Sequence, residues 1–225
     1  AEPPPASQVQ EDVGVESELF EAMRFAVEHH HPPTLRQLLR AQQDSASVLR
    51  MRDSNGSTLL HMAGMVPPDG TVYATMVCLL SKQAEVNAQN ILGETPLLMA
   101  IRSAMDSHSN DSDGSCLQPV RCLLEGHADV NTVDGLNGET PLVEAACSGS
   151  EPMCRLLLEF RADVAHEMDN GVTALNFAES GGHSAVARLL QEAAGCEGAG
   201  RPGAGRQGDG NGEGAGSSEQ PAPVP

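Results

Sequence analysis

Large aromatic side chains are scarce in this chain of 225 residues, which contains four Phe, one Tyr and no Trp. A compact enzyme core usually relies on such rings for much of its buried area, whereas thin helices packed through Leu, Ala and Val do not need them. Rings are also the surfaces on which single-stranded nucleic acids stack. The scarcity therefore disfavours a compact enzyme and a single-strand binder.

Positive charge is also scarce. The chain has 13 basic residues against 31 acidic ones, a formal net charge of -18, and Lys82 is its only lysine. Nucleic acids and anionic membranes are bound through clustered Lys and Arg, so we expect neither as a partner. Because proteins of opposite net charge associate faster, the negative net charge favours a basic protein partner.

Long apolar runs and targeting signals are missing as well. No stretch approaches the ~18 consecutive apolar residues of a membrane-spanning helix. Residues 1–18 lack the basic and apolar regions of a secretory signal. Six Cys without such a signal or a paired framework indicate a reducing compartment, so we expect a cytoplasmic or nuclear protein.

One pattern recurs four times along the chain: Gly, any residue, Thr, any residue, Leu, and then Ala three positions later. The four copies are marked by Thr58, Thr95, Thr140 and Thr173. Each of the first three copies is followed by a Leu-rich run and by Ala-Glu-Val or Ala-Asp-Val, at residues 78–86, 122–130 and 156–164. Internal repetition of this kind is typical of stacked-repeat folds.

The pattern resembles the ankyrin consensus, G-x-T-P-L-H-x-A-A followed by V-V-x-L-L-L-x-x-G-A-D-V-N, over about residues 19–195. The resemblance implies an all-α fold, an ankyrin-repeat α-solenoid of about five helix-turn-helix units with short β-turn fingers. The units are expected at about residues 19–52, 53–89, 90–133, 134–167 and 168–195. In the degenerate first unit the register assigns the core to Met23, Ala26, Leu35, Leu38 and Leu39.

Spacing between the copies locates insertions and tails. Thr140 and Thr173 are 33 residues apart, which is the standard period, but the two earlier spacings are 37 and 45. Loop composition places the extra residues at Pro67–Gly70 and at about 103–115, between the two helices of a unit. Residues 1–18 and the Gly/Pro-rich residues 196–225 are expected to be disordered tails.

Each recurring residue has a mechanical reason. We expect the Gly at positive φ in a turn and the Thr at the helix N-cap. Pro96 and Pro141 suit the first helical position. The small Ala lets the paired helices approach closely, and the Leu runs face the next unit.

Polar residues that could carry chemistry have structural explanations. His31 and His183 share a slot in the inter-helix loop, and His61 fills the His of the consensus. The acidic insertion lacks the closing Glu of a calcium loop, so we interpret it as solvated, with a phosphorylatable or partner-contacting loop as the alternative. No Walker, G-x-S-x-G or H-E-x-x-H motif is present. We expect no enzyme activity, no cofactor and no metal site.

The cysteines follow the same logic. Cys78 and Cys122 share one core slot and Cys154 occupies another, so we expect small buried hydrophobes. Asn87 and Asn131 close their units in a manner similar to repeats that asparaginyl hydroxylases modify. The same Asn is also standard for structural reasons.

The resemblance places partner binding on the fingers before each Thr and on the exposed positions of the first helices, which together form a concave groove. By register, these positions are Asn55, Ser57, Met62, Met65, Ile91, Leu92, Glu94, Met99, Arg102, Leu136, Glu139, Glu144, Asp169, Asn170, Val172 and Phe177. Ile91, Leu92 and Leu136 are apolar where fingertips are usually polar, and an apolar patch with an acidic rim suits a protein contact. The alternative is that some of them only pad neighbouring turns.

These observations predict a monomeric, non-enzymatic scaffold or adaptor that binds a basic or amphipathic segment of a protein partner. The alternative is a regulatory or targeting fragment of a larger multidomain protein, such as a ligase adaptor, kinase or channel. Ala1 in place of an initiator Met and the Gly-rich tail favour this alternative slightly.

Overall fold

The computed structural model describes residues 6–29, 31–41, 45–66, 70–106 and 116–198. Its helices are α1 (Ala6–Glu28), α2 (Pro32–Ala41), α3 (Ser45–Leu49), α4 (Leu59–Met65), α5 (Gly70–Ser81), α6 (Pro96–Asp106), α7 (Leu117–Glu125), α8 (Pro141–Cys147), α9 (Glu151–Glu159), α10 (Ala174–Ser180) and α11 (Ser184–Gly198). The described residues contain no strand, only an isolated bridge between Glu167 and Thr173. The expected all-α class is confirmed.

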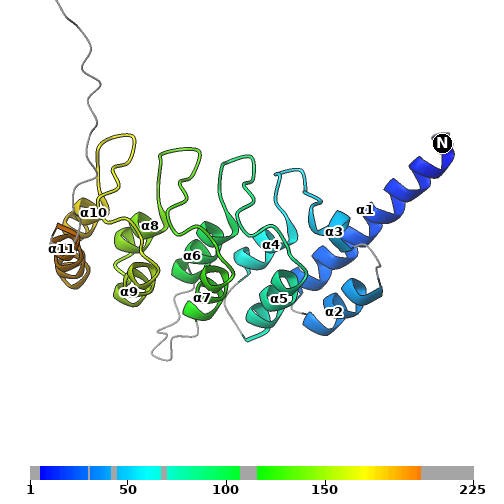
Figure 1. Ribbon diagram of the computed structural model, residues 1–225, viewed down its shortest axis with the longest axis horizontal. Coiled ribbons are helices and arrows are strands. Elements are labelled where there is room, and N and C mark those ends of the chain that lie inside the picture. Colours follow the sequence, from blue (N-terminus) through cyan, green and yellow to red (C-terminus); the bar gives the residue numbers. More distant parts are fainter. Residues whose placement is uncertain (1–5, 30, 42–44, 67–69, 107–115, 199–225) are drawn as a thin grey trace, which may run out of the picture.

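The helices stack as antiparallel pairs along the long axis of the molecule. The first helices α1, α4, α6, α8 and α10 pack against one another in series, and the second helices α2, α5, α7, α9 and α11 form a parallel series. Figure 1 shows these two rows below a line of loops. This is the α-solenoid that the repeat pattern predicts.

Leu side chains fill the space between successive units. Leu79, Leu123 and Leu157 are buried on the second helices, and Leu97 and Leu142 are buried on the first. Full burial of one Leu side chain contributes about 1.5–3 kcal/mol. Because each unit buries its Leu face largely against its neighbours, stability belongs to the stack rather than to any single pair.

The degenerate first unit follows the same register. Met23, Ala26, Leu35 and Leu39 are buried, and Leu38 packs partly buried against them. The core positions expected for this unit are therefore confirmed, although its sequence lacks the Gly and Thr of the later copies.

The first helices begin as the recurring residues predict. Thr58, Thr140 and Thr173 adopt extended backbone at the N-cap of α4, α8 and α10. The Thr140 hydroxyl accepts a hydrogen bond from the backbone N–H of Val143 at 3.4 Å, which satisfies one free donor of the first turn. Pro141 follows directly at the first helical position, where its missing N–H leaves no hydrogen bond unmade.

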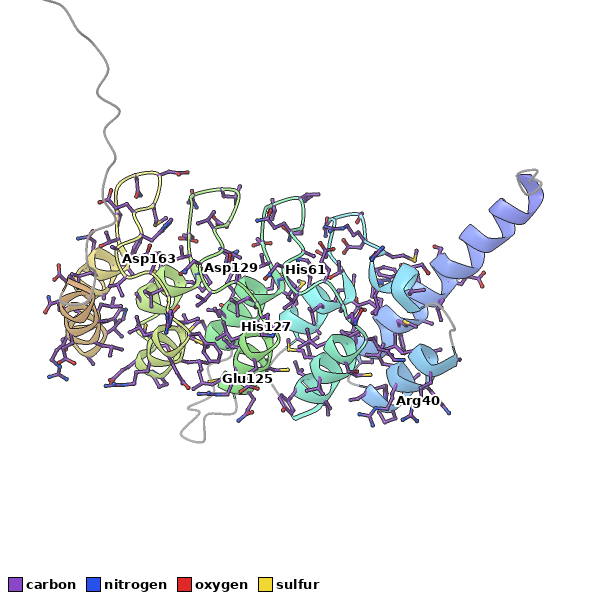
Figure 2. All side chains as sticks on the ribbon, in the orientation of Figure 1. Arg40, His61, Glu125, His127, Asp129 and Asp163 are labelled. Carbon is purple, nitrogen blue, oxygen red and sulfur yellow. The ribbon has the colours of Figure 1, made fainter. Side chains whose placement is uncertain are left out.

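An Asn side chain joins consecutive units at the turn after each of two second helices. Asn87 Oδ1 accepts from the backbone N–H of Asp129 at 2.9 Å, and Asn87 Nδ2 donates to the carbonyl of His127 at 3.3 Å. Asn131 repeats this one unit later, accepting from the backbone N–H of Asp163 at 2.8 Å. Figure 2 labels Asp129 and Asp163 at these turns. Both Asn residues therefore have a structural role, and their hydroxylation stays a hypothesis.

Four helix ends differ from the expected boundaries. α5 begins at Gly70, which was expected to be the last residue of the short insertion. α1 begins at Ala6, so residues 6–18 are helical rather than part of a disordered tail; they extend a helix whose later turns are packed, and each added residue closes one more backbone hydrogen bond. Residues 103–106 belong to α6 rather than to the insertion, because buried Ala104 packs its last turn into the core. α11 extends to Gly198, three residues into the expected tail.

The remaining insertion residues 107–115, the short insertion at 67–69 and residues 1–5 and 199–225 lie outside the described residues. Of the helices that the structure describes, none is both long and apolar enough to cross a membrane.

Candidate functional site

Four loops, which we call the fingers, connect the second helix of one unit to the first helix of the next. They comprise residues 52–57, 89–94, 133–139 and 167–172 and stand in a line along one edge of the solenoid (Figure 1). Each finger reverses direction at a Gly with φ between 70° and 75°. The positive φ expected for the recurring Gly is confirmed, and this backbone shape suits residues without a Cβ.

A side-chain oxygen at the base holds each of the first three fingers in its turn. Asp53 Oδ1 accepts from the backbone N–H groups of Asn55 and Ser57 at 2.8 and 2.7 Å. Asn90 accepts two such bonds in the second finger, and Asp134 accepts two in the third. These local bonds are the Asx turns that short polar side chains form, and they pre-organise the fingertips.

Backbone hydrogen bonds also join neighbouring fingers. The N–H of Ile91 donates to the carbonyl of Asn55 at 3.0 Å, and the N–H of Gly135 donates to the carbonyl of Leu92 at 2.9 Å. A longer bond of 3.4 Å joins the third finger to the fourth. The spacing between successive fingertips is therefore set by the main chain.

The two middle fingers present apolar side chains to solvent. Ile91 is 70% exposed and Leu136 is 62% exposed, and Leu92 and Val133 are exposed beside them. Burial of such exposed apolar side chains against a partner removes unfavourable contact with water, which makes them suited to a partner surface.

Arg102 of α6 lies at the centre of an ionic cluster below these tips. Its guanidinium pairs with Glu94 and Glu139 from the two middle fingers, the latter at 3.2 Å, with Glu144 of α8 at 3.2 Å, and with buried Asp134 at 3.5 Å. One positive charge thus faces four carboxylates. The cluster bridges two consecutive units and retains an excess of negative charge.

The pKa values of the cluster reflect this crowding. Burial lowers the pKa of Arg102, but the hydrogen bond and charge of Glu144 and the charges of Glu94 and Glu139 outweigh it, so the pKa is raised above its ordinary value. The pKa of Glu139 is raised by burial and by its neighbours Glu144 and Asp134, against the opposing effect of Arg102. Burial also raises the pKa of Asp134, but backbone N–H donors and Arg102 bring the net pKa below its usual range.

A hollow on α4 and α6 adjoins the cluster. Its lining combines the thioether side chains of Met65 and Met99 with the polar groups of Glu94, Arg102 and Asp106. Met65 is exposed and Met99 is half-buried. Flexible, polarizable Met side chains adapt to varied apolar groups, so the hollow can accept an apolar side chain next to carboxylates.

Most of the residues that the sequence assigned to binding lie on this face. Those exposed or half-buried in the structure are Asn55, Met65, Ile91, Leu92, Glu94, Met99, Arg102, Leu136, Glu139, Glu144, Asp169, Asn170, Val172 and Phe177. Ion pairs bring Glu94, Glu139 and Glu144 together around Arg102. We use the name groove for a set of nine residues: these four, the apolar residues of the two middle fingers and the two Met of the hollow, namely Met65, Ile91, Leu92, Glu94, Met99, Arg102, Leu136, Glu139 and Glu144.

The expectation of exposure is wrong for Met62 and Ser57. Met62 is 6% exposed, because α4 packs between α1 and α6 and is buried over nearly its whole length. Ser57 is also buried, with its backbone N–H tied to Asp53. Neither side chain is available to a partner in this structure.

His61 has the structural role that its place in the consensus predicts. It is fully buried, and its Nδ1 accepts from the backbone N–H of Thr58 at 3.1 Å while Nε2 lies 3.1 Å from the carbonyl of Glu94. These partners require the neutral Nε2–H tautomer. Burial lowers its pKa, which also favours the neutral ring.

Sequence reasoning missed Asp134, which both shapes a finger and pairs with Arg102. A signal was present, because Asp53, Asn90 and Asp134 each precede the turn Gly of their fingers by three or four residues. The repeated Asx marks the base of the finger, as recurring short polar residues in turns usually do.

The expected burial of three cysteines is confirmed. Cys78, Cys122 and Cys154 are buried, and desolvation raises the pKa of Cys122 to about 11 and that of Cys154 to about 12. Such thiols are poor nucleophiles. Within the part of the chain that the structure describes, no group of three or more His, Cys, Asp or Glu is arranged to hold a metal ion.

Comparison with known proteins gives consistent matches. A family model described as ankyrin repeats (3 copies) matches residues 109–198. The Danio rerio protein named "Putative palmitoyltransferase ZDHHC13" is 28% identical over 160 residues, which are 70% of this chain and 22% of that protein.

Two Mus musculus proteins are similar as well. The B-cell lymphoma 3 protein homolog is 29% identical over 138 residues, which are 61% of this chain and 28% of that protein. Ankyrin repeat and SAM domain-containing protein 6 is 36% identical over 91 residues, which are 40% of this chain and 9% of that protein. The chain therefore spans less than a third of the length of each of these three relatives.

Proposed function

The chain belongs to the ankyrin-repeat family, and we propose that it is a non-enzymatic scaffold or adaptor that captures a protein partner in the groove. Repeats of this family generally mediate protein–protein interaction and are typically non-catalytic. The similarity to the palmitoyltransferase lies in its ankyrin region alone, so it gives no support for catalysis in this chain. The segment that suits the groove is basic and amphipathic.

The observation that carries this proposal is the juxtaposition of apolar fingertips and surplus carboxylates. Ile91 and Leu136 can each bury an apolar side chain, which contributes up to about 1.5–3 kcal/mol. A partner's Lys or Arg near Glu139 or Glu144 forms a partly exposed ion pair, typically only ~0.2–1 kcal/mol. The apolar fingertips thus supply most of the binding free energy. The carboxylates select a positively charged partner and increase its association rate.

The proposal is tested with a labelled helical peptide that repeats Lys-Leu-Leu-Lys, whose binding is followed by fluorescence anisotropy. We expect the double variant Ile91→Asp, Leu136→Asp to bind at least about tenfold more weakly, because two apolar contacts are lost. The new carboxylates attract a basic peptide, so weaker binding isolates the apolar contribution.

A matched control places the same substitution elsewhere. Tyr73→Asp with Val77→Asp changes two exposed apolar residues of α5, outside the groove, and is expected to bind the peptide as the wild type does. Circular dichroism checks that both variants keep their helicity. If the two double variants bind equally well, the groove is wrongly assigned. Crosslinking from a cell extract with the same pair of variants then identifies the natural partner.

We further propose that the protein acts as a monomer in the cytoplasm or nucleus. Among the described residues, Cys78, Cys122, Cys147 and Cys154 form no disulfide, which supports a reducing compartment. Light scattering and imaging of the tagged chain test these two points. The alternative role, as a regulatory or targeting module of a larger protein, would use the same groove, so the peptide experiment applies to it equally.

A further inference from the structure

Charge is distributed unevenly along this acidic chain. Residues 32–82 contain five of the 13 basic residues but only three of the 31 acidic ones. Arg36 and Arg40 are the only charged residues of α2, and α5 has none. The N-terminal part of the solenoid is therefore locally positive, while the remainder has eight basic and 28 acidic residues.

These cations border a hollow between two second helices. Arg36 and Arg40 of α2 and Lys82, which follows α5, form its charged rim, while Leu39, Val77 and Cys78 supply apolar lining. The three cations are exposed, as is Val77. The hollow is thus positively charged around an apolar centre, the reverse in sign of the groove.

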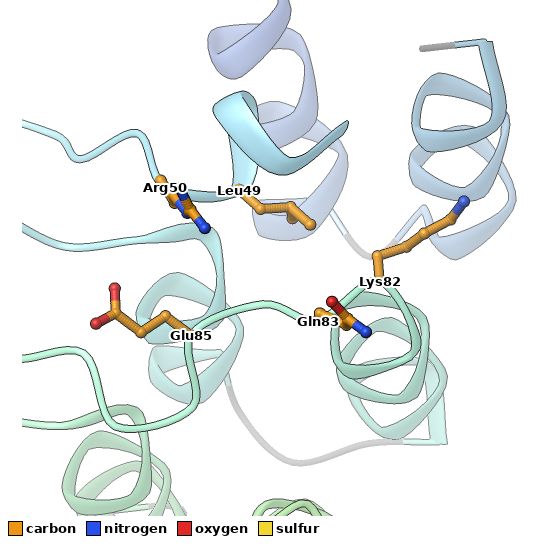
Figure 3. Close-up of a pocket in the computed structure, with 5 residues that line it drawn as sticks. All are labelled: Leu49, Arg50, Lys82, Gln83 and Glu85. Carbon is orange, nitrogen blue, oxygen red and sulfur yellow. The ribbon is translucent and has the colours of Figure 1, made fainter. Parts of the chain in front are cut away.

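A second hollow continues from the first. Lys82 also lines a cavity between the end of α3 and the turn after α5, together with Leu49, Arg50, Gln83 and Glu85 (Figure 3). Glu85 is already paired with Arg52 at 3.4 Å. Arg50 therefore extends the positive rim, and Lys82 is shared by both hollows. We call the residues Arg36, Arg40, Arg50 and Lys82 the basic rim.

Among the described residues, the basic rim lacks the counter-charges found elsewhere on the second helices. Arg121 of α7 pairs with Glu159 at 3.2 Å, and Arg155 of α9 pairs with Glu151 at 2.6 Å. No residue within the described ranges forms an ion pair with the basic rim. An anionic ligand would consequently meet cations that need not first give up a partner.

Three residues of the basic rim, Arg36, Arg40 and Lys82, lie away from the fingers, whereas Arg50 is two residues before the first finger. α2 and α5 belong to the row of second helices, whereas the fingers precede the first helices (Figure 1). Figure 2 places Arg40 at the far edge of α2, on the side opposite the line of fingers. A ligand here would not compete directly with one in the groove.

We propose that the two hollows bordered by the basic rim form a second docking surface, which binds an acidic protein segment carrying at least one apolar side chain. Charge complementarity indicates that the ligand is negatively charged, and the apolar lining of the hollow indicates that the ligand has an apolar side chain to fill it. A duplex or a membrane surface would extend past four cations onto a surface rich in carboxylates, which repels phosphates. A short acidic peptide avoids that repulsion because it covers the rim alone.

Binding is tested with the full chain and a labelled peptide that repeats Glu-Glu-Leu. The variant Arg36→Gln, Arg40→Gln, Lys82→Gln is expected to bind this peptide about tenfold more weakly, since three exposed ionic contacts are lost. The matched control Arg121→Gln, Arg155→Gln, Arg188→Gln removes equal charge from other second helices and should leave peptide binding within about twofold. Affinity of the wild type should also fall with added salt.

Three results would overturn the proposal. The first is equal weakening by both triple variants, which would mean that only net charge matters. The second is wild-type affinity for an anionic phospholipid vesicle or a duplex oligonucleotide that exceeds its affinity for the peptide. The third is the absence of any measurable peptide binding at low salt. The Lys-Leu-Leu-Lys peptide serves as an independent readout of the groove, which the basic-rim variant should leave intact.

Discussion

Replacement of Gly93 by Ala tests how tightly neighbouring fingers are packed. Gly93 has a φ of +75°, and a Cβ at this position would lie 2.5 Å from the backbone nitrogen of Gly135 and 2.8 Å from its Cα. That nitrogen belongs to the hydrogen bond that ties the third finger to the carbonyl of Leu92. Gly171 offers the matched control, because its φ is +74° but no atom lies within 4 Å of the corresponding Cβ.

The two substitutions share one cost and differ in another. A non-Gly residue at this positive φ costs about 1–2 kcal/mol at either position. At Gly93 the clash is with backbone, so relief requires displacing the third finger, at an overpacking cost of about 1–3 kcal/mol. Loss of the finger-to-finger hydrogen bond adds about 0.5–1.5 kcal/mol. We expect destabilisation of about 2.5–6.5 kcal/mol for Gly93→Ala and about 1–2 kcal/mol for Gly171→Ala.

Urea unfolding followed by far-ultraviolet circular dichroism measures the difference. The slope of the transition must be compared among the three proteins, because a repeat stack can lose cooperativity and unfold in parts. Equal destabilisation by the two Ala variants would refute the reasoning, since it would show that the contact between fingers contributes nothing. The groove peptide should also bind Gly93→Ala more weakly than Gly171→Ala, because the displaced third finger carries Leu136 away from Ile91 on the second.

Two further predictions concern single side chains. Burial lowers the pKa of His61, so below about pH 6.5 the unfolded chain binds a proton at this residue more readily than the folded chain does. The free energy of unfolding should therefore decrease as the pH is lowered through this range, by up to about 1.4 kcal/mol per pH unit. Urea titrations at several pH values should show a smaller decrease for His61→Leu. Gln83 has a φ of 62°, which is strained for a residue with a Cβ. Gln83→Gly should relieve this strain and stabilise the fold by a net amount of about 0.5–1 kcal/mol, after subtracting the greater chain entropy that Gly loses on folding. An unchanged or lower Tm would count against backbone strain at this position.

The repeat pattern carries most of the fold because its residues act locally. The N-caps, the turn Gly and the buried Leu runs each depend on a few neighbouring residues at a fixed spacing, so a single sequence specifies them. Register alone also predicted that Ile91, Leu136 and Arg102 are accessible, and they are exposed or half-buried in the structure. These assignments need no knowledge of long-range contacts.

Other features depend on contacts that no local pattern records. Arg102 forms ion pairs with carboxylates from α8 and from two fingers. The sequence predicts only that these residues lie on the same side of the solenoid. Met62 is buried because the degenerate first unit covers α4, and that unit lacks the motif that would fix its position. The hydrogen bond between Gly135 and Leu92 joins main-chain atoms, so the amino-acid sequence does not indicate it.

That main-chain bond acts as a ruler. It fixes the span between two fingertips through main-chain atoms, so neighbouring tip side chains can change without altering that span as long as residue 135 stays Gly, where a Cβ would lie 2.7 Å from the carbonyl oxygen of Leu92. The side chains at the tips, such as Leu136, can consequently be exchanged while the main-chain frame that displays them stays the same.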